Sequence, residues 1–184
     1  MAERKLVFFS FTLGIIALFI FVFLLVENKW VLMLIPESVR SGEVWRFFTY
    51  SFVHEDIEHL IENCIGFALV SFIAYELGFG IKRLVVVYLI SSIFAVLPVW
   101  FFLKFIAFGA SAMIFALFAF ESPELRSFKI NLGIVYLIIA VVMFFQIKEK
   151  YSFAGHLCGF VFGLGLYCGF KIFDKRKQKI LRRC

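Results

Sequence analysis

Charged residues are scarce in this 184-residue chain. They make up 17% of it, whereas hydrophobic residues make up 63% and 28 residues are phenylalanine. This balance excludes an ordinary soluble domain, because such a domain needs more polar exterior than the chain can supply. The excess apolar surface must face lipid, and the length suits one membrane domain over residues 1–184.

The signals of several other protein classes are also missing. The first apolar run, residues 6–26, has no small-residue cleavage site, so we expect a retained membrane helix and not a signal peptide. No internal repeat or low-complexity linker divides the chain. The cysteines have no framework spacing, so they are expected to be reduced packing residues: Cys64, Cys158, Cys168 and Cys184.

Apolar runs bounded by charges predict an all-α polytopic membrane protein with six transmembrane helices. Residues 27–56 are too polar to span a bilayer and too aromatic for a free linker, so we expect short elements at the membrane interface. A basic tail, residues 173–184, ends the chain. The expected spans are residues 6–26, 57–78, 83–103, 109–120, 130–147 and 153–172.

Lysine and arginine predict the orientation of these spans. With the N-terminus inside, the inner segments hold thirteen basic residues and the outer segments hold six. The positive-inside rule then places both termini in the cytoplasm. Orientation and contact with anionic membrane lipids explain the basic tail without a nucleic-acid partner.

The fourth span is short and begins on small residues, Gly109-Ala110-Ser111. Only ~24 Å of helix fits between Lys104 and Glu121, so the preceding chain is expected to enter the membrane without helical structure. A helix that begins there has free N–H groups and a positive dipole end beside the serine. A small-residue helix contact or a serine N-cap is the structural alternative.

The sixth span carries a histidine among glycines that recur at every fourth residue. Gly155, Gly159 and Gly163 are expected to line one face where another helix approaches closely, and His156 lies near that face. A partner helix that carries Ser111 would bring hydroxyl and imidazole within hydrogen-bond reach, as nucleophilic catalysis requires. A purely structural hydrogen bond remains the alternative for a lone histidine.

The second span begins with HEDIEHLIENC. His59 and Asn63 are four residues apart and share a helix face, and His54 lies just before them. A metal site is the rival interpretation, but the spacing is not that of zinc proteases and asparagine is a poor ligand. Donors aimed at an oxyanion suit this pair better. Under the predicted topology, three helices therefore place polar groups at similar depth in the outer half of the membrane.

Four stretches of the chain, within residues 42–170, resemble the rhomboid family of intramembrane serine proteases. GEVWRFFTYSFVHEDIEHLIEN is similar to the family's Trp-Arg loop and its His-x4-His-x3-Asn signature. YELGFGIKRLVVVYL resembles the pattern that joins the second and third spans. GASA resembles the nucleophile motif, and AGHLCGFVFG resembles the histidine helix.

The resemblance implies that Ser111 is the nucleophile and His156 its general base. His59 and Asn63, with the backbone N–H of Ser111, would form the oxyanion hole. It further implies supporting roles for His54, for Gly109 in the nucleophile motif, and for Trp45 and Arg46 in holding the interfacial loop.

The chain departs from the family pattern at three positions. Ala112 and Ala116 stand where many members have glycine, which is expected to loosen the contact between the fourth and sixth spans. Phe115 stands where a tyrosine is common, and its ring is expected to pack on the histidine. None of these departures removes a catalytic group.

The expected activity is that of a serine endopeptidase that cleaves transmembrane-helix substrates near their outer end, with a Ser–His dyad, an acyl-enzyme intermediate and no cofactor or metal. The expected partners are transmembrane substrates and membrane lipids, in a prokaryotic cell membrane, with the fifth span as the substrate gate. Two rivals are a non-enzymatic relative that escorts membrane proteins and a small transporter with a histidine proton relay. The transporter is disfavoured by the lack of paired acids within the spans.

Overall fold

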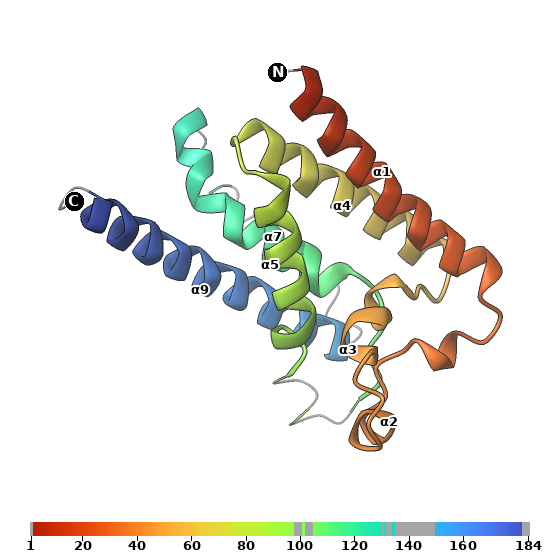
Figure 1. Ribbon diagram of the computed structural model, residues 1–184. Coiled ribbons are helices and arrows are strands. Elements are labelled where there is room, and N and C mark those ends of the chain that lie inside the picture. Colours follow the sequence, from red (N-terminus) through yellow and green to blue (C-terminus); the bar gives the residue numbers. More distant parts are fainter. Residues whose placement is uncertain are drawn as a thin grey trace.

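The structure is a computed structural model, and it describes residues 2–97, 101, 105–129, 131, 134 and 150–181. Its main helices are α1 (Ala2–Leu25), α4 (Ile57–Glu76), α5 (Ile81–Phe94), α7 (Ser111–Glu121) and α9 (Lys150–Leu181) (Figure 1). Shorter elements are η1 (Lys29–Val31), α2 (Pro36–Arg40), α3 (Arg46–Thr49), η2 (Tyr50–Phe52) and η3 (Ser122–Phe128). Over these ranges the only β pairing is an isolated bridge between Leu34 and Ala107.

Among the residues that the structure describes, three helices are long and apolar enough to cross a membrane: Glu3–Leu25, Ile57–Glu76 and Phe153–Lys175. Large apolar side chains stand exposed along their outer surfaces, among them Leu13, Ile65 and Val161. Such an exterior is costly in water but neutral in hydrocarbon. The molecule is therefore a helical integral membrane protein.

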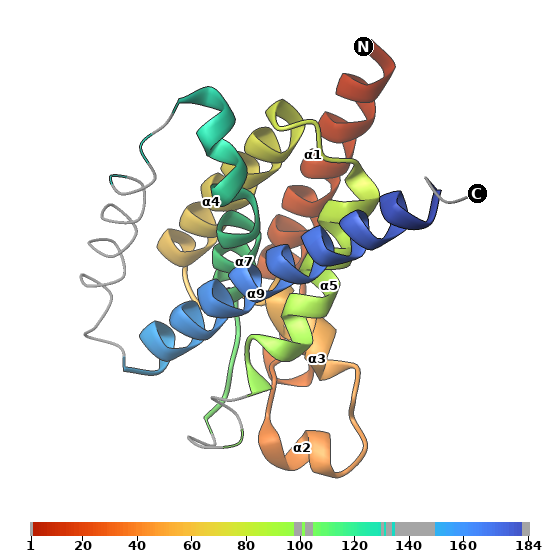
Figure 2. The same cartoon turned by 90° about the vertical axis from the view of Figure 1, so that its left-hand side faces the viewer.

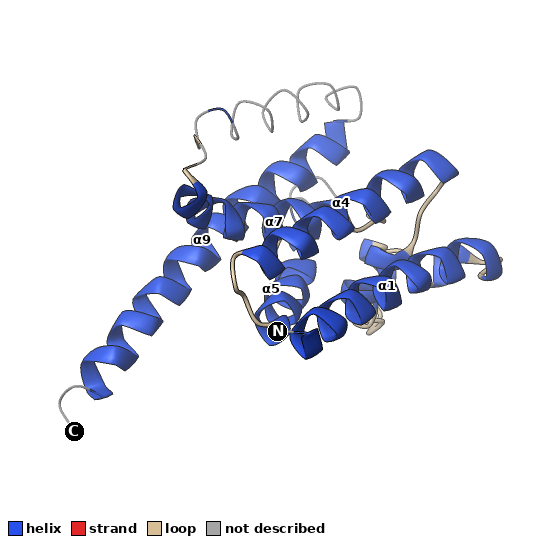
Figure 3. Ribbon diagram, turned by 90° about the horizontal axis from the view of Figure 1, so that it is seen from above, coloured by secondary structure: helices blue, strands red, loops and turns tan. Residues whose placement is uncertain are grey.

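Helix α7 lies at the centre of the bundle. It contacts α4, α5 and α9, which surround it in Figure 2. Its small residues Ala112, Ala116 and Ala119 are all buried, which allows neighbouring backbones to approach closely. Helices α1 and α4 pack along each other at one side, whereas the C-terminal part of α9 extends beyond the bundle (Figure 3).

Residues 27–56, for which the sequence predicts an interfacial loop, are folded into short helical elements. The guanidinium of Arg46 is buried and donates to the carbonyl oxygens of Trp30 and Met33 at 2.6 and 2.7 Å, and it pairs with Glu43. Paired and hydrogen-bonded in this way, a buried charge is tolerated. Arg46 thus ties α3 to the first part of the loop.

The expected spans differ from the helices in three places. Helix α5 ends at Phe94 and is followed by a turn, so the span predicted at 83–103 is interrupted. The sequence explains this, because a proline at position 98 cannot donate to the carbonyl of Phe94. Helix α7 begins at Ser111 because Gly109, with φ of +91°, has a left-handed backbone conformation.

The third difference is at the C-terminus, where α9 continues through Leu181 into the predicted tail. Lysine and arginine are favourable in the last turns of a helix, which accounts for this extension. The predicted fifth span, residues 130–147, lies outside the described residues except for Asn131 and Ile134.

Candidate active site

Ser111 occupies the first position of α7, directly after the N-cap residue Ala110. Its side chain is half-buried. Ser111 is not the N-cap of the helix, because that position is Ala110, which makes no side-chain hydrogen bond. The backbone N–H groups of a first helical turn have no partner within the helix. The serine hydroxyl therefore stands beside free donors at the positive end of the helix.

His156 of α9 meets this serine. Its Nε2 lies 2.7 Å from the Ser111 Oγ, which is hydrogen-bonding distance, and only 4% of the histidine is exposed. The ring of Phe115 lies on the imidazole, with centroids 4.7 Å apart. Within the described part of the chain, the Nδ1 of His156 has no hydrogen-bond partner. The arrangement is a serine–histidine pair without an observed third member.

The α7–α9 contact brings the two side chains together. A Cβ on Gly159 would collide with the carbonyl oxygen of Ala112, and one on Gly163 would collide with the carbonyl oxygen of Ala116. Only glycine permits backbones to approach this closely. The alanines at 112 and 116 each have a glycine opposite them, and the two backbones lie close together at both positions.

Gly155 does not share this packing role. Gly155 is buried, but a Cβ there would meet nothing within 4 Å in the described structure, so the close backbone contact seen at Gly159 and Gly163 does not extend to this position.

His59 reaches the nucleophile segment from α4. A Cβ on Gly109 would lie 2.7 Å from both Cε1 and Nε2 of the His59 ring, so the imidazole covers this glycine. Asp56 caps α4 by accepting from the backbone N–H of His59 at 2.8 Å, which fixes where the helix begins. Because glycine has no side chain, Gly109 can adopt the left-handed conformation of the turn and the His59 ring can lie against it.

Asn63 lies one turn further along α4 and is buried. Its Nδ2 donates to the carbonyl oxygen of His59 at 2.8 Å, whereas its Oδ1 has no partner among the residues described. An amide nitrogen carries two N–H groups, so one donor is left after this bond. The asparagine can therefore donate to a further acceptor.

His54 is fully buried beneath these residues, 5.2 Å from the ring of His59 and 5.1 Å from that of Phe19. The pKa of His54 is lowered from 6.5 to about 4, mainly by burial and also by the neighbouring His59. His54 is therefore neutral at physiological pH. Over the described ranges, no three His, Cys, Asp or Glu side chains gather into a metal-binding group.

The two residues of the Trp-Arg pair behave differently. Arg46 holds the loop through the carbonyl contacts described above, but Trp45 is half exposed at 50%. An amphipathic ring at this position suits the membrane interface.

Tyr50 is a residue that the sequence reading missed. Its carbonyl oxygen accepts from the N–H of Gly109 at 2.9 Å, and its hydroxyl donates to the carbonyl of Ser92 in α5 at 2.9 Å. The same hydroxyl lies 3.1 Å from the sulfur of Met113 in α7. Tyr50 thus joins the interfacial loop, α5 and the nucleophile helix. The sequence offered no signal for this beyond an aromatic residue in a loop rich in them.

Comparison with known proteins identifies the family of the chain. A search against curated proteins finds no match. The family model for the rhomboid domain matches residues 41–173, which include Ser111, His156, His59 and Asn63. The match covers more than half of the chain, and it follows that the protein belongs to the rhomboid family of intramembrane serine proteases.

Proposed function

We propose that this protein is a serine endopeptidase that cleaves transmembrane-helix substrates with a dyad of Ser111 and His156. The observation that carries the proposal is the 2.7 Å contact between the Ser111 Oγ and the His156 Nε2. These two residues come from different helices and are 45 positions apart, so local structure alone does not explain the contact. A base in hydrogen-bond contact with a hydroxyl is the arrangement that activates a serine nucleophile.

The reaction follows from this contact. The Ser111 oxygen attacks the scissile carbonyl carbon while His156 takes the hydroxyl proton. The C–N bond then breaks, and His156 returns the proton to the leaving amine, which leaves an acyl-enzyme ester on Ser111. Water, deprotonated by His156, attacks the ester and releases the new carboxyl end together with free Ser111.

The oxyanion formed in each attack needs donors in fixed positions. The backbone N–H of Ser111 at the start of α7, the His59 ring over Gly109 and the remaining N–H of Asn63 are the candidates. Loss of one such donor typically lowers kcat by about 10²–10³-fold. We expect Asn63→Ala to fall in this range without loss of folded protein.

Orientation of His156 does not require an acid in this proposal. The Nδ1 has no partner in the described structure, and the Phe115 ring holds one face of the imidazole by packing. A neutral histidine buried in this way keeps Nε2 free to accept the serine proton. The phenyl ring does this without the hydroxyl that many family members carry.

The substrate is a transmembrane helix that unwinds near its outer end, because a hydrogen-bonded helix cannot present an extended peptide to the serine. The distribution of basic residues supports cytoplasmic termini and an outward-facing site. A prokaryotic cell membrane remains the expected location. A gate at the fifth span falls on residues outside the described ranges. No cofactor is needed for this chemistry.

The test is cleavage of a fluorescent transmembrane substrate in liposomes, combined with fluorophosphonate labelling of the purified protein. Ser111→Ala should abolish labelling and cleavage, and His156→Ala should abolish cleavage. Ser122→Ala is the matched control, because that serine lies just beyond the opposite end of α7 and donates to the carbonyl of Ala119. Equal labelling of wild type and Ser111→Ala would refute the proposal. It would leave the escort and transporter alternatives.

A further inference from the structure

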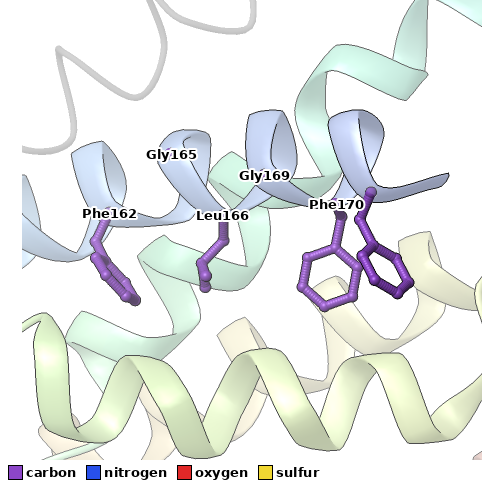
Figure 4. Close-up of a pocket in the computed structure, with 6 residues that line it drawn as sticks. Phe162, Gly165, Leu166, Gly169 and Phe170 are labelled. Carbon is purple, nitrogen blue, oxygen red and sulfur yellow. The ribbon is translucent and has the colours of Figure 1, made fainter. Parts of the chain in front are cut away.

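An apolar groove of about 560 Å³ runs along the middle of α9, from Phe162 to Phe173. In Figure 4 the side chains of Phe162, Leu166 and Phe170 point from α9 toward α5. A Cβ at Gly165 or Gly169 would meet nothing within 4 Å, so the groove is open beside both glycines. The residues that line it are Phe162, Gly165, Leu166, Gly169, Phe170 and Phe173.

Contacts between α5 and α9 close the two ends of the groove. At one end the rings of Phe94 and Phe162 stack with centroids 5.4 Å apart and an interplanar angle of 13°. At the other end the Arg83 guanidinium lies 5.5 Å from the centroid of Phe170 and pairs with Asp174 at 3.2 Å. The groove is thus apolar along its length and charged at one end only.

The length of the groove indicates what can fill it. The helical rise between Phe162 and Phe173 is about 16 Å, close to half of a ~30 Å hydrocarbon core. The apolar span of α9 runs from Phe153 to Lys175, so the groove lies in the part of that span next to Arg83 and therefore in one leaflet. A transmembrane helix from another protein or a second copy would need a surface through both leaflets, whereas a lipid acyl chain needs only one.

Charge at the Arg83 end indicates the class of lipid. Cations outnumber acids there, and part of the positive charge is left after the ion pairs of Arg83 with Asp174 and of Lys171 with Glu124. Lys82 and Lys175 are exposed beside these pairs. Basic side chains at this depth attract anionic headgroups, and a guanidinium suits a phosphate because it can donate two parallel hydrogen bonds.

We propose that this groove binds one acyl chain of an anionic phospholipid, whose phosphate is bound by Arg83 with Lys175 beside it. The acyl chain lies along Leu166 and Gly169 and fills the groove on this face of α9. A lipid that binds only the folded protein also stabilises it. The site is remote from Ser111, and its occupancy does not depend on proteolysis.

The test is native mass spectrometry of the full chain in detergent, with phosphatidylglycerol or phosphatidylcholine of identical acyl chains added. Wild type should retain one phosphatidylglycerol in preference to phosphatidylcholine. The double substitution Gly165→Leu with Gly169→Leu fills the groove and should abolish this adduct. Gly14→Leu in α1 is the matched control, because a Cβ there also meets nothing within 4 Å, and it should leave the adduct unchanged.

The headgroup contact has its own pair of variants. Arg83→Gln should weaken phosphatidylglycerol binding about fivefold, the equivalent of ~1 kcal/mol for one basic residue near the membrane surface. Arg40→Gln should not, although Arg40 also pairs with an acid, Glu37, at 3.8 Å. The rise in Tm on adding phosphatidylglycerol should shrink in parallel for Arg83→Gln.

Three results would overturn the proposal. Equal retention of the two lipids would show that the headgroup is not recognised. A phosphatidylglycerol adduct that survives in the folded, groove-filled variant would place the lipid elsewhere. A dimer that the groove-filling substitutions dissociate would assign the groove to a second copy of the chain. If the filled variant does not fold, an unchanged affinity in Arg83→Gln is by itself sufficient to reject the proposal.

Discussion

The two halves of α9, defined here as the parts before and after Leu164, both carry glycine, but these glycines differ in what lies opposite them. In the first half, Gly159 and Gly163 lie against backbone carbonyls of α7, and the contact holds His156 beside Ser111. In the second half, Gly165 and Gly169 face no atom within 4 Å and leave a groove. A glycine in a membrane helix therefore marks either a close approach or an open space, depending on what stands opposite.

The polar groups of the two halves differ in the same way. His156 is buried in the first half, where packing fixes its position. The second half holds Tyr167, Lys171 and Asp174, whose partners are partly exposed side chains of η3 and α5. We expect substitutions in the first half to change activity strongly, and those in the second half to change it little.

The largest effect should come from Gly159→Ala compared with Gly165→Ala. The new methyl group at 159 must push α9 away from the Ala112 carbonyl, which should cost about 1–3 kcal/mol of stability. His156 lies one turn away, and a displacement of ~1 Å from its partner lowers activity about 10²-fold. Gly165→Ala should leave activity unchanged and raise stability by up to ~1 kcal/mol through its helix propensity. Cleavage rates and thermal unfolding in detergent measure both.

Tyr50→Phe should have the next largest effect. It removes the hydroxyl that donates to Ser92, and a buried carbonyl left without its partner costs about 1–3 kcal/mol. Tyr167→Phe is the matched control in the second half of α9, since that hydroxyl donates to the partly exposed Glu124 at 2.8 Å and its loss should cost less. If both variants unfold at the same temperature, Tyr50 is not the tie between loop and helix that its contacts indicate.

His54 should make the fold sensitive to acid. Burial and the nearby His59 and Lys29 lower its pKa to about 4, whereas the unfolded chain takes up this proton near pH 6.5. The unfolded state thus binds more protons between these values, so stability should fall as the pH drops from about 6.5 to 4. His54→Phe should flatten this part of the Tm-against-pH curve. An unchanged curve would assign the acid sensitivity to other groups.

Glu124→Gln should have the smallest effect. The bond from Lys171, and then that from Tyr167, lower the pKa of the Glu124 carboxyl below its usual value. A carboxyl with a lowered pKa stabilises the fold above its ordinary pKa and loses this contribution as the pH falls through the lowered value. Because the pair is partly exposed, we expect less than about 1 kcal/mol at pH 7, and no effect on cleavage. Thermal unfolding at pH 7 and pH 3 tests the stability change. A loss of cleavage activity would contradict the expectation that the second half of α9 has little effect on activity.

Much of the site could be predicted because each motif has its own local chemistry. The sequence alone shows a serine that follows a glycine at the start of a helix. It also shows a histidine four residues before an asparagine. The sequence does not show how far the close contact between α7 and α9 extends, and in the structure it includes Gly159 and Gly163 but not Gly155. Whether Ala112 and Ala116 loosen this contact also depends on the residues opposite them, which are glycines.

The limit of prediction from the sequence is clearer for Tyr50 and for the groove. No pattern distinguishes Tyr50 from the other aromatic residues of the loop, because its partners Gly109 and Ser92 are distant in sequence. Likewise, Gly159 and Gly165 are the same residue type in one apolar run. The sequence therefore does not show that one lies in a close contact and the other beside a groove.

The sequence by itself determined the membrane class, the apolar helices and the order of the chemical groups, because composition and periodicity depend only on neighbours along the chain. Only the tertiary structure decided which groups meet: the hydroxyl of Ser111 with the imidazole of His156, and the Tyr50 carbonyl with the nucleophile turn. The physical reason is that these contacts depend on helix separations set by the atoms opposite each glycine, to within a fraction of an ångström.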